Sequence, residues 1–321
     1  HNSLSKHNIS LRETAFLFDD RLKLDGSASF LRQTTKNRNP SGGFYMNSLV
    51  GLYRFPRGVD ISEYKENYEV WNPSRNLNEQ NWHSDTQDFE QNPYWVTNRI
   101  RSKDSRTRTI LSLNAELKVT DWFKIQARGS LDYLSDKVRQ MFYASTAPAL
   151  SGQNGRYIDA DYQETLLYGD IIGSFEKKFG QFSLNGVIGA SINDKLVNSL
   201  RYDSKTASLK YANVFNVANI IMDGSAYIDQ QIDAHRQLQS LFATAQVGYK
   251  DIFFLDLTAR NDWSSTLAFT PNEKKGFFYP SVGGAWVMSK MFRLPDFISF
   301  GKLRAVWSKV GGGQSEDNFF V

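Results

Sequence analysis

The strongest constraint on this chain is an alternation of apolar and polar residues with a period of two. Between residues 21 and 31, one face reads Leu22, Leu24, Gly26, Ala28 and Phe30, and the other reads Lys23, Asp25, Ser27 and Ser29. This period indicates β-strands with one apolar and one polar face. Runs of this length are long enough to cross a bilayer as strands.

The same pattern predicts about ten strands, which pair as five antiparallel hairpins. Further runs lie at 8–17, 108–119, 123–133, 241–249, 253–259, 282–288 and 303–307, with two weaker strands between 163 and 198. The connections alternate in length. Short turns are predicted near 18–20, 120–121, 179–181 and 250–251, with a longer one at 289–299 on the same side. Long loops are predicted at 35–105, 138–162, 199–234 and 262–276.

Short periplasmic turns opposite long extracellular loops are typical of outer-membrane barrels. We therefore predict an all-β fold, an antiparallel transmembrane β-barrel. Aromatic residues make up 14% of the chain although its mean hydropathy is −0.47. Many of them flank the short turns, and we expect a periplasmic aromatic girdle that includes Trp122, Phe123, Tyr249 and Phe253.

A soluble antiparallel sandwich is the alternative, because its strands also alternate. Long strands, glycine and alanine on the apolar face, and rings at one rim favour the barrel. A register slip of one residue in 123–133 would turn Lys124, Arg128 and Asp132 toward lipid. A lysine or arginine at the midplane costs about 2–4 kcal/mol. The Ile125 face is therefore predicted to contact lipid, and the opposite face to line a lumen.

Composition excludes several classes of protein. No stretch approaches the length of about 18 apolar residues that a spanning helix needs. The absence of cysteine removes disulfides, cysteine-ligated zinc and cysteine nucleophiles. The net charge of +4, with both signs interspersed, argues against a nucleic-acid partner. We predict no catalytic site and no cofactor.

The predicted topology places both ends of the chain at the long-loop rim, because the first strand enters a short turn and the last strand leaves one. Ten open strands would leave two unpaired edges in lipid. We therefore expect 1–321 to be an internal portion of a larger barrel, or to need another piece to close it.

Several segments resemble one known family. Residues 254–266 (FLDLTARNDWSST), 278–282 (FYPSV) and 298–311 (ISFGKLRAVWSKVG) closely resemble the middle of the barrel in SusC/RagA TonB-dependent outer-membrane transporters. The hairpin at 17–25 (LFDDRLKLD) has a similar character.

The resemblance implies a 22-stranded barrel closed by a plug and located in the outer membrane. It further implies energy from TonB, a SusD-like surface lipoprotein as lid, and import of oligosaccharides or peptides. On this basis we expect 1–321 to be a partial TonB-dependent transporter β-barrel domain, without the signal peptide, plug, TonB-contacting motif and remaining strands. The alternative is a non-transporting outer-membrane β-protein whose long loops serve adhesion or assembly.

The long loop at 35–105 holds the candidate substrate or lid contacts. Its tyrosines and tryptophans stand among Asn, Gln and Asp, a mixture that can stack on sugars or peptides and hydrogen-bond them. Trp82, Tyr94, Trp95 and Trp71 are the candidates. The competing hypothesis, which we favour, is that the rings pack the loop onto itself or a partner.

Arg260, Asp262 and Trp263 are predicted to form a structural cluster at the extracellular rim rather than a binding site. Asp85, Asp88 and Glu90 could bind Ca²⁺ through carboxylate oxygens, although a solvated acidic stretch is the preferred interpretation. The four histidines show no metal-ligand spacing.

Overall fold

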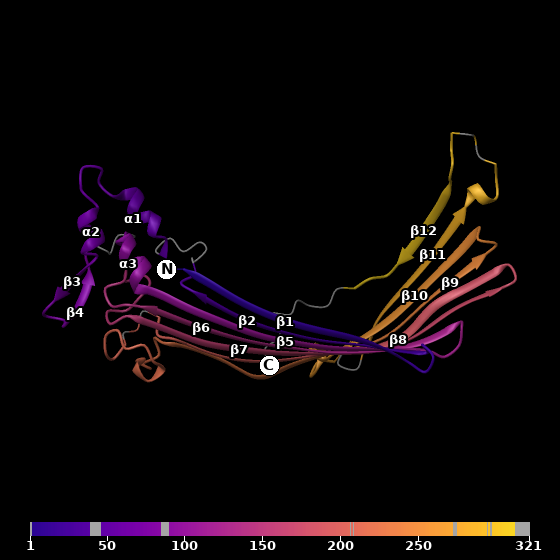
Figure 1. The fold of residues 1–321 in the computed structure, drawn as a ribbon, viewed down its shortest axis with the longest axis horizontal. Coiled ribbons are helices and arrows are strands. Elements are labelled where there is room, and N and C mark those ends of the chain that lie inside the picture. The colour runs from indigo at the N-terminus through magenta and orange to yellow at the C-terminus, as the bar shows by residue number, and fades with distance from the viewer. Residues whose placement is uncertain are drawn as a thin grey trace.

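The computed structural model describes residues 2–38, 46–84, 90–205, 207, 209–271, 275–293, 295 and 297–311. Ten strands in this part form one antiparallel sheet in chain order, and two more form a separate hairpin (Figure 1). The sheet strands are β1 Ser3–Leu17, β2 Leu22–Lys36, β5 Ile100–Lys118, β6 Phe123–Phe142, β7 Arg156–Phe179, β8 Phe182–Asp203, β9 Tyr227–Tyr249, β10 Phe253–Ser264, β11 Phe277–Val287 and β12 Lys302–Ser308. The hairpin is β3 Glu69–Asn72 and β4 Leu77–Gln80, and the helices are α1 Ser48–Arg54, α2 Ser62–Glu66 and α3 Pro93–Arg99. The predicted all-β antiparallel architecture is confirmed.

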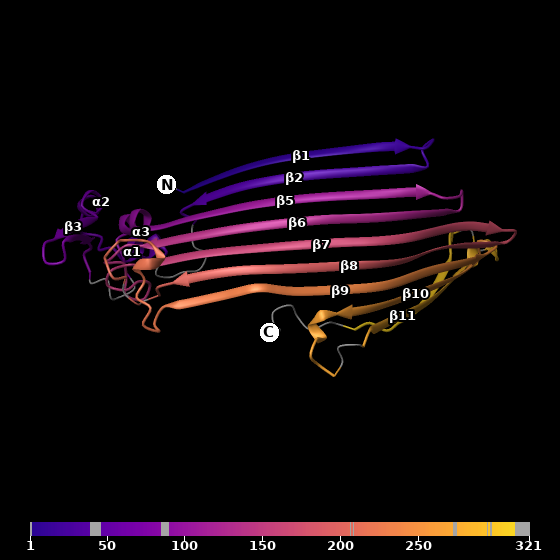
Figure 2. The ribbon, with the colours of Figure 1, turned by 90° about the horizontal axis from the view of Figure 1, so that it is seen from below.

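The strands pair as five hairpins, and their connections fall into two classes. The short turns lie at one end of the sheet and the long loops at the other (Figure 2). Lys250 and Asp251 form a two-residue turn with φ of 53° and 54°. Positive φ at both positions is the geometry that suits the twist of a tight hairpin. β1 begins at the long-loop rim, as the predicted topology requires (Figure 2).

The register joins each apolar run to its neighbour, so the two faces stay distinct across the sheet. Leu113 of β5 lies opposite Gly26 of β2 and Gly129 of β6. Leu113, Ile171, Ile188 and Leu241 are more than half exposed on this outward face. An exposed apolar face of this kind is suited to contact with lipid acyl chains.

The inward face carries polar side chains that pair across strands. Arg128 donates from Nε to Asp170 Oδ1 at 3.0 Å, and Arg108 Nε donates to Asp132 Oδ1 at 2.8 Å. Gln126 Nε2 donates to Asn114 Oδ1 at 2.8 Å. The predicted polar face therefore carries pairs of polar groups that bond across neighbouring strands.

The strands are longer than the alternation predicts. β7 extends over 24 residues and β9 over 23. The outward apolar residues of neighbouring strands, such as Leu113, Ile171 and Leu241, form a belt across the sheet that we call the apolar band. Between this band and the long-loop rim the outward positions are polar, as at Gln163 and Gln239. Both faces are then polar, so the period of two disappears from the sequence while the backbone ladder continues.

Rings gather at the short-turn rim on the outward face. Phe253 of β10 stacks on Trp286 of β11 with centroids 6.1 Å apart, and Tyr249 lies 4.9 Å from Phe182. Trp122 and Phe123 are adjacent at 5.9 Å, and the Lys177 ammonium lies 5.0 Å from the Trp122 ring centroid. The four girdle residues thus occupy one rim, an arrangement that fits a membrane–water boundary.

Buried side chains concentrate at the opposite, long-loop rim. Tyr157, Leu209 and Ile220 form an apolar core there, with Phe215 and Val217 packed against it. No helix in the described residues is both long and apolar enough to span a membrane.

Candidate functional site

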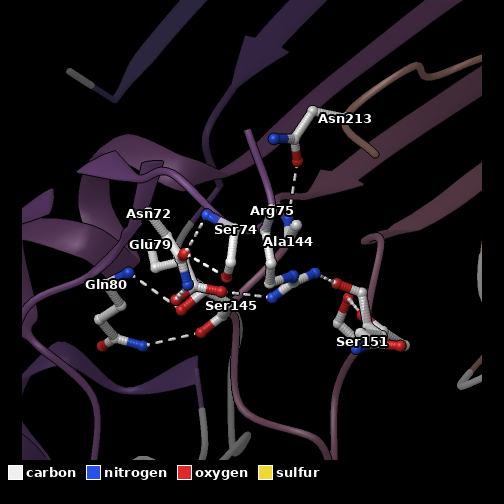
Figure 3. A network of polar contacts seen from close by, with 11 residues as sticks. Asn72, Ser74, Arg75, Glu79, Gln80, Ala144, Ser145, Ser151 and Asn213 are labelled. Atoms are coloured by element: carbon white, nitrogen blue, oxygen red, sulfur yellow. Dashed lines mark hydrogen bonds and ion pairs between the residues drawn. The ribbon is translucent and has the colours of Figure 1, made fainter. Parts of the chain in front are cut away.

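Three connections pack together at the long-loop rim, and we call their described residues the loop cluster: 46–84 with 90–99, then 143–155, and then 204, 205, 207 and 209–226. The first connection joins β2 to β5, the second joins β6 to β7, and the third joins β8 to β9. Segments far apart in sequence are joined by direct contacts in this cluster (Figure 3). The helices and the β3–β4 hairpin inside 46–99 were not predicted from the sequence.

Asn92 is the central polar residue of the first connection, and it is fully buried. It caps α3 by accepting from the Tyr94 amide at 2.8 Å, and Pro93 occupies the first helical turn. Its Nδ2 donates to the carbonyls of Tyr64 and Asn81, both at 2.8 Å. The Asn-Pro pair is a recognisable helix start. The bonds to Tyr64 and Asn81, which are distant in the sequence, have no local sequence signal.

The second connection fastens to the first through main-chain and side-chain bonds. The Gln80 amide donates to Ser145 Oγ at 2.9 Å, and its Nε2 donates to the Ser145 carbonyl at 3.1 Å (Figure 3). Arg75 pairs with Glu79 and donates to the Gln153 carbonyl at 2.6 Å. These bonds fix the β3–β4 hairpin against residues 143–155.

The third connection is fixed by two asparagines. Asn213 Oδ1 accepts from the Ala144 amide at 2.7 Å (Figure 3), and Asn154 Nδ2 donates to the Leu209 carbonyl at 2.8 Å. Gly155 lies between them with φ of 104°, and a Cβ there would lie 2.7 Å from the Phe142 carbonyl oxygen. A side chain at this position would force the β6–β7 connection apart.

The four candidate contact residues divide by exposure. Trp95 is 1% exposed and donates from Nε1 to Thr146 Oγ1 at 3.1 Å. Trp82 packs against Phe55 at 5.2 Å and Tyr64 at 5.4 Å, and Tyr94 is partly buried on α3. Trp71 on β3 is 54% exposed. Trp95 and Trp82 therefore pack inside the loop cluster. Trp71 is exposed to solvent and stays a predicted contact for substrate or lid.

The structure separates the cluster predicted at Arg260, Asp262 and Trp263. Arg260 donates from Nε to Asp262 Oδ1 at 2.7 Å and from Nη2 to Ser240 Oγ at 2.8 Å. These two residues lie on the inward face of β10. Trp263 alternates to the outward face, where it lines a groove of about 710 Å³ with Ile171, Ile192 and Leu241.

The predicted calcium ligands are Asp85, Asp88 and Glu90. Asp85 and Asp88 lie outside the described residues. Glu90 is buried and pairs with Arg54, with Oε1 2.6 Å from Nε. No cluster of three His, Cys, Asp or Glu suited to a metal occurs in the described ranges. Calcium binding here stays a prediction.

Sequence reasoning missed the buried ion pair at the base of the cluster. Asp203, only 2% exposed, accepts from Arg156 Nε at 2.8 Å and from Arg201 Nη2 at 3.0 Å. Burial alone would raise the pKa of Asp203, but the hydrogen bonds from Arg156, the Lys205 amide and Arg201 hold that pKa below its ordinary value. Nearby, burial and a hydrogen bond donated to Asp159 raise the pKa of Tyr157 to about 12.

The lowered pKa of Asp203 predicts that the loop cluster loosens in acid. A group whose pKa falls on folding stabilises the fold above its ordinary pKa of about 3.9, and this stabilisation disappears as pH falls through the folded value. Hydrogen exchange of the Tyr157 and Ser204 amides should therefore accelerate, after correction for intrinsic rates, as pH drops below about 4. Asp203→Asn should exchange fast throughout and lose this pH dependence. Unchanged protection down to pH 2 would contradict the assignment.

Known proteins resemble this chain in part of its sequence and in its fold. No family model matches the chain. A TonB-dependent receptor P26 of Formosa agariphila is 36% identical over 77 residues, which is 23% of this chain and 8% of that protein. Among solved structures, the RagAB peptide transporter matches with a TM-score of 0.68 at 14% identity, covering 95% of this chain and 32% of that one.

Two further solved structures extend the comparison. The RagAB peptide importer in its open-open state gives a TM-score of 0.68 at 13% identity, again over 95% of this chain and 32% of that one. FpvA of P. aeruginosa bound to pyoverdine gives 0.50 at 15% identity, over 89% and 33%. The chain spans about a third of the length of these structures. The likeness shows the fold: this sheet has the architecture of part of the barrel wall in TonB-dependent transporters, as the sequence resemblance predicts.

Proposed function

We propose that this chain forms part of the barrel wall of an outer-membrane, TonB-dependent nutrient transporter. The observation that carries the proposal is the match of the ten-stranded sheet to the RagAB transporter over 95% of the chain. The similar protein in Formosa agariphila is named a TonB-dependent receptor, which supports the same class. The matched proteins are transporters and receptors by name, and this supports a function other than catalysis.

The two faces of the sheet support a transporting barrel. Lipid suits the outward apolar face, because hydrocarbon contact with unpaired charge would be costly. The inward face holds its charges in pairs such as Arg128 with Asp170, where Nη2 lies 2.5 Å from Oδ2. Paired charges and amides can hydrogen-bond a polar solute without presenting one dominant sign. Such a wall suits oligosaccharides or peptides, which are polar and carry little net charge.

A surface lipoprotein lid of the SusD type is the partner we propose for the loop cluster. α1 exposes Tyr53 at 85%, together with Leu49 and Leu52, and Trp71 stands exposed on β3. Exposed apolar and aromatic side chains that gather at one rim are typical of protein contact sites. The same surface could contact substrate under the lid.

Uptake in the native bacterium tests the proposal. Deletion of the gene should abolish accumulation of either fluorescent peptides or fluorescent oligosaccharides, and dissipating the proton gradient in the parent strain should do the same. Accumulation that resumes with a plasmid copy provides the control. Normal uptake of both solute classes by the deletion strain, with loss of surface adhesion, would instead support the adhesion alternative.

A further inference from the structure

Charge is distributed unequally between the two faces of β1, β2, β5 and β6 near the long-loop rim. Above the apolar band, the inward positions pair opposite charges, as in Arg106 Nε to Asp136 Oδ1 at 2.7 Å. Toward the long-loop rim, the described outward positions of the same four strands, within residues 3–9, 30–36, 101–109 and 133–141, contain no Asp or Glu. They carry Arg32, Lys36, Arg101, Lys103, Lys137 and Arg139.

The register places like charges directly opposite one another on this outward face. Lys36 of β2 pairs with Lys103 of β5, and Lys103 pairs with Arg139 of β6. Directly opposed like charges destabilise an antiparallel pair. An external anion that neutralises the row would remove this cost.

Neighbouring carboxylates relieve only one end of the row. On β7, Asp159 Oδ1 lies 3.3 Å from Arg139 Nε, and Asp161 Oδ1 lies 3.7 Å from Lys137 Nζ. In the described part of the chain, Lys36 and Lys103 have no carboxylate within ion-pair distance. The uncompensated charge therefore lies on β2 and β5.

A cavity of about 290 Å³ lies among these cations. Lys36, Arg101 and Lys103 line it with hydrogen-bonding groups of Asn37, Asn98 and Ser102. Arg101 is held in place by donating from Nε to the Asn98 carbonyl at 2.8 Å and by packing over Tyr143 at 5.7 Å. The lining contains no carboxylate. Cations with polar neighbours around a small cavity suit a phosphate group.

The orientation of the site indicates where the phosphate comes from. The site faces outward, on the side of the apolar band rather than the lumen. Phe30 ends the apolar positions of β2, and Arg32 begins the cationic ones two residues later on the same face. Lipid headgroups occupy the layer directly above the acyl chains. We propose that Lys36, Arg101 and Lys103 bind phosphate groups of an anionic membrane glycolipid.

Binding of a phosphorylated glycolipid by the full protein in detergent tests this site. The probe is lipid A, compared with enzymatically dephosphorylated lipid A and with inorganic phosphate. Lys36→Gln combined with Lys103→Gln should weaken lipid A binding about 25-fold, since each cation near an anionic lipid surface contributes roughly fivefold. Binding should also weaken as salt is raised.

The matched control is Lys6→Gln, an exposed lysine at the same rim on the inward face of β1. It should leave lipid A binding unchanged. Heat-modifiable migration of each variant confirms that its barrel is folded. Equal binding by the double variant, or equal affinity for dephosphorylated lipid A, would overturn the proposal. Inorganic phosphate that binds as tightly as lipid A would also overturn it, because the site would then take a free anion.

Discussion

Trp95→Ala is expected to open the loop cluster, with a loss of about 3–5 kcal/mol in local stability. The indole is 1% exposed, so its removal leaves a large cavity between α3 and residues 143–147. Thr146, itself 4% exposed, would also lose the partner of its hydroxyl. An unsatisfied buried polar group adds to the cost of the cavity. Hydrogen exchange of the Val96 and Ala147 amides should accelerate by at least a hundredfold, up to the limit set by the cluster's own opening.

The matched control is Trp71→Ala, which removes the same side chain from an exposed position on β3. It should change the same exchange rates by less than threefold, because surface truncations stay within about 0.5 kcal/mol. If Trp71 contacts substrate or lid, this variant should instead weaken partner or substrate binding with the cluster intact. Equal acceleration by both variants would show that the cluster does not depend on Trp95 packing.

The strands were predictable because their signal is local. In a strand that faces lipid on one side and water on the other, each residue reports its own face, as Leu111 and Ser112 do. The short turns, and the register of the hairpins that they close, follow from the same alternation. The signal ends where both faces meet water, which is why β7 and β9 extend well past their predicted ends.

The loop cluster was not predictable in the same way, because its contacts join distant parts of the chain. Trp95 and Thr146 are 51 positions apart, and Asn92 satisfies carbonyls 28 and 11 positions away. Nothing in the composition of 35–105 distinguishes a tryptophan that packs from one that binds. Asn92-Pro93 carried a local signal, as the start of α3. The cationic row at Lys36 and Lys103 likewise requires the register, which the alternation alone does not give between β2 and β5.

The apolar face allows a second prediction of large effect, which tests its contact with lipid. Leu113 is 57% exposed at the middle of the apolar band of β5, between Leu111 and Ala115. Leu113→Arg should lower the free energy of unfolding by about 2–4 kcal/mol, the cost of arginine at the bilayer midplane. The guanidinium is too deep there for its side chain to reach headgroup water without distorting the bilayer. Urea unfolding of the full protein in lipid vesicles measures the change.

The adjacent position provides the control, because one step along a strand reverses the face. Ser112 points inward and shares a hydrogen bond of 2.7 Å with Ser27. Ser112→Arg loses that bond, worth about 1 kcal/mol, but places the guanidinium in a polar lumen beside Asn114. The two variants add the same charge to the same strand. The difference between their free energies of unfolding therefore shows whether lipid or water contacts each face. Equal destabilisation, or a larger loss from Ser112→Arg, would mean that the Leu113 face does not meet lipid and would favour the soluble sandwich instead.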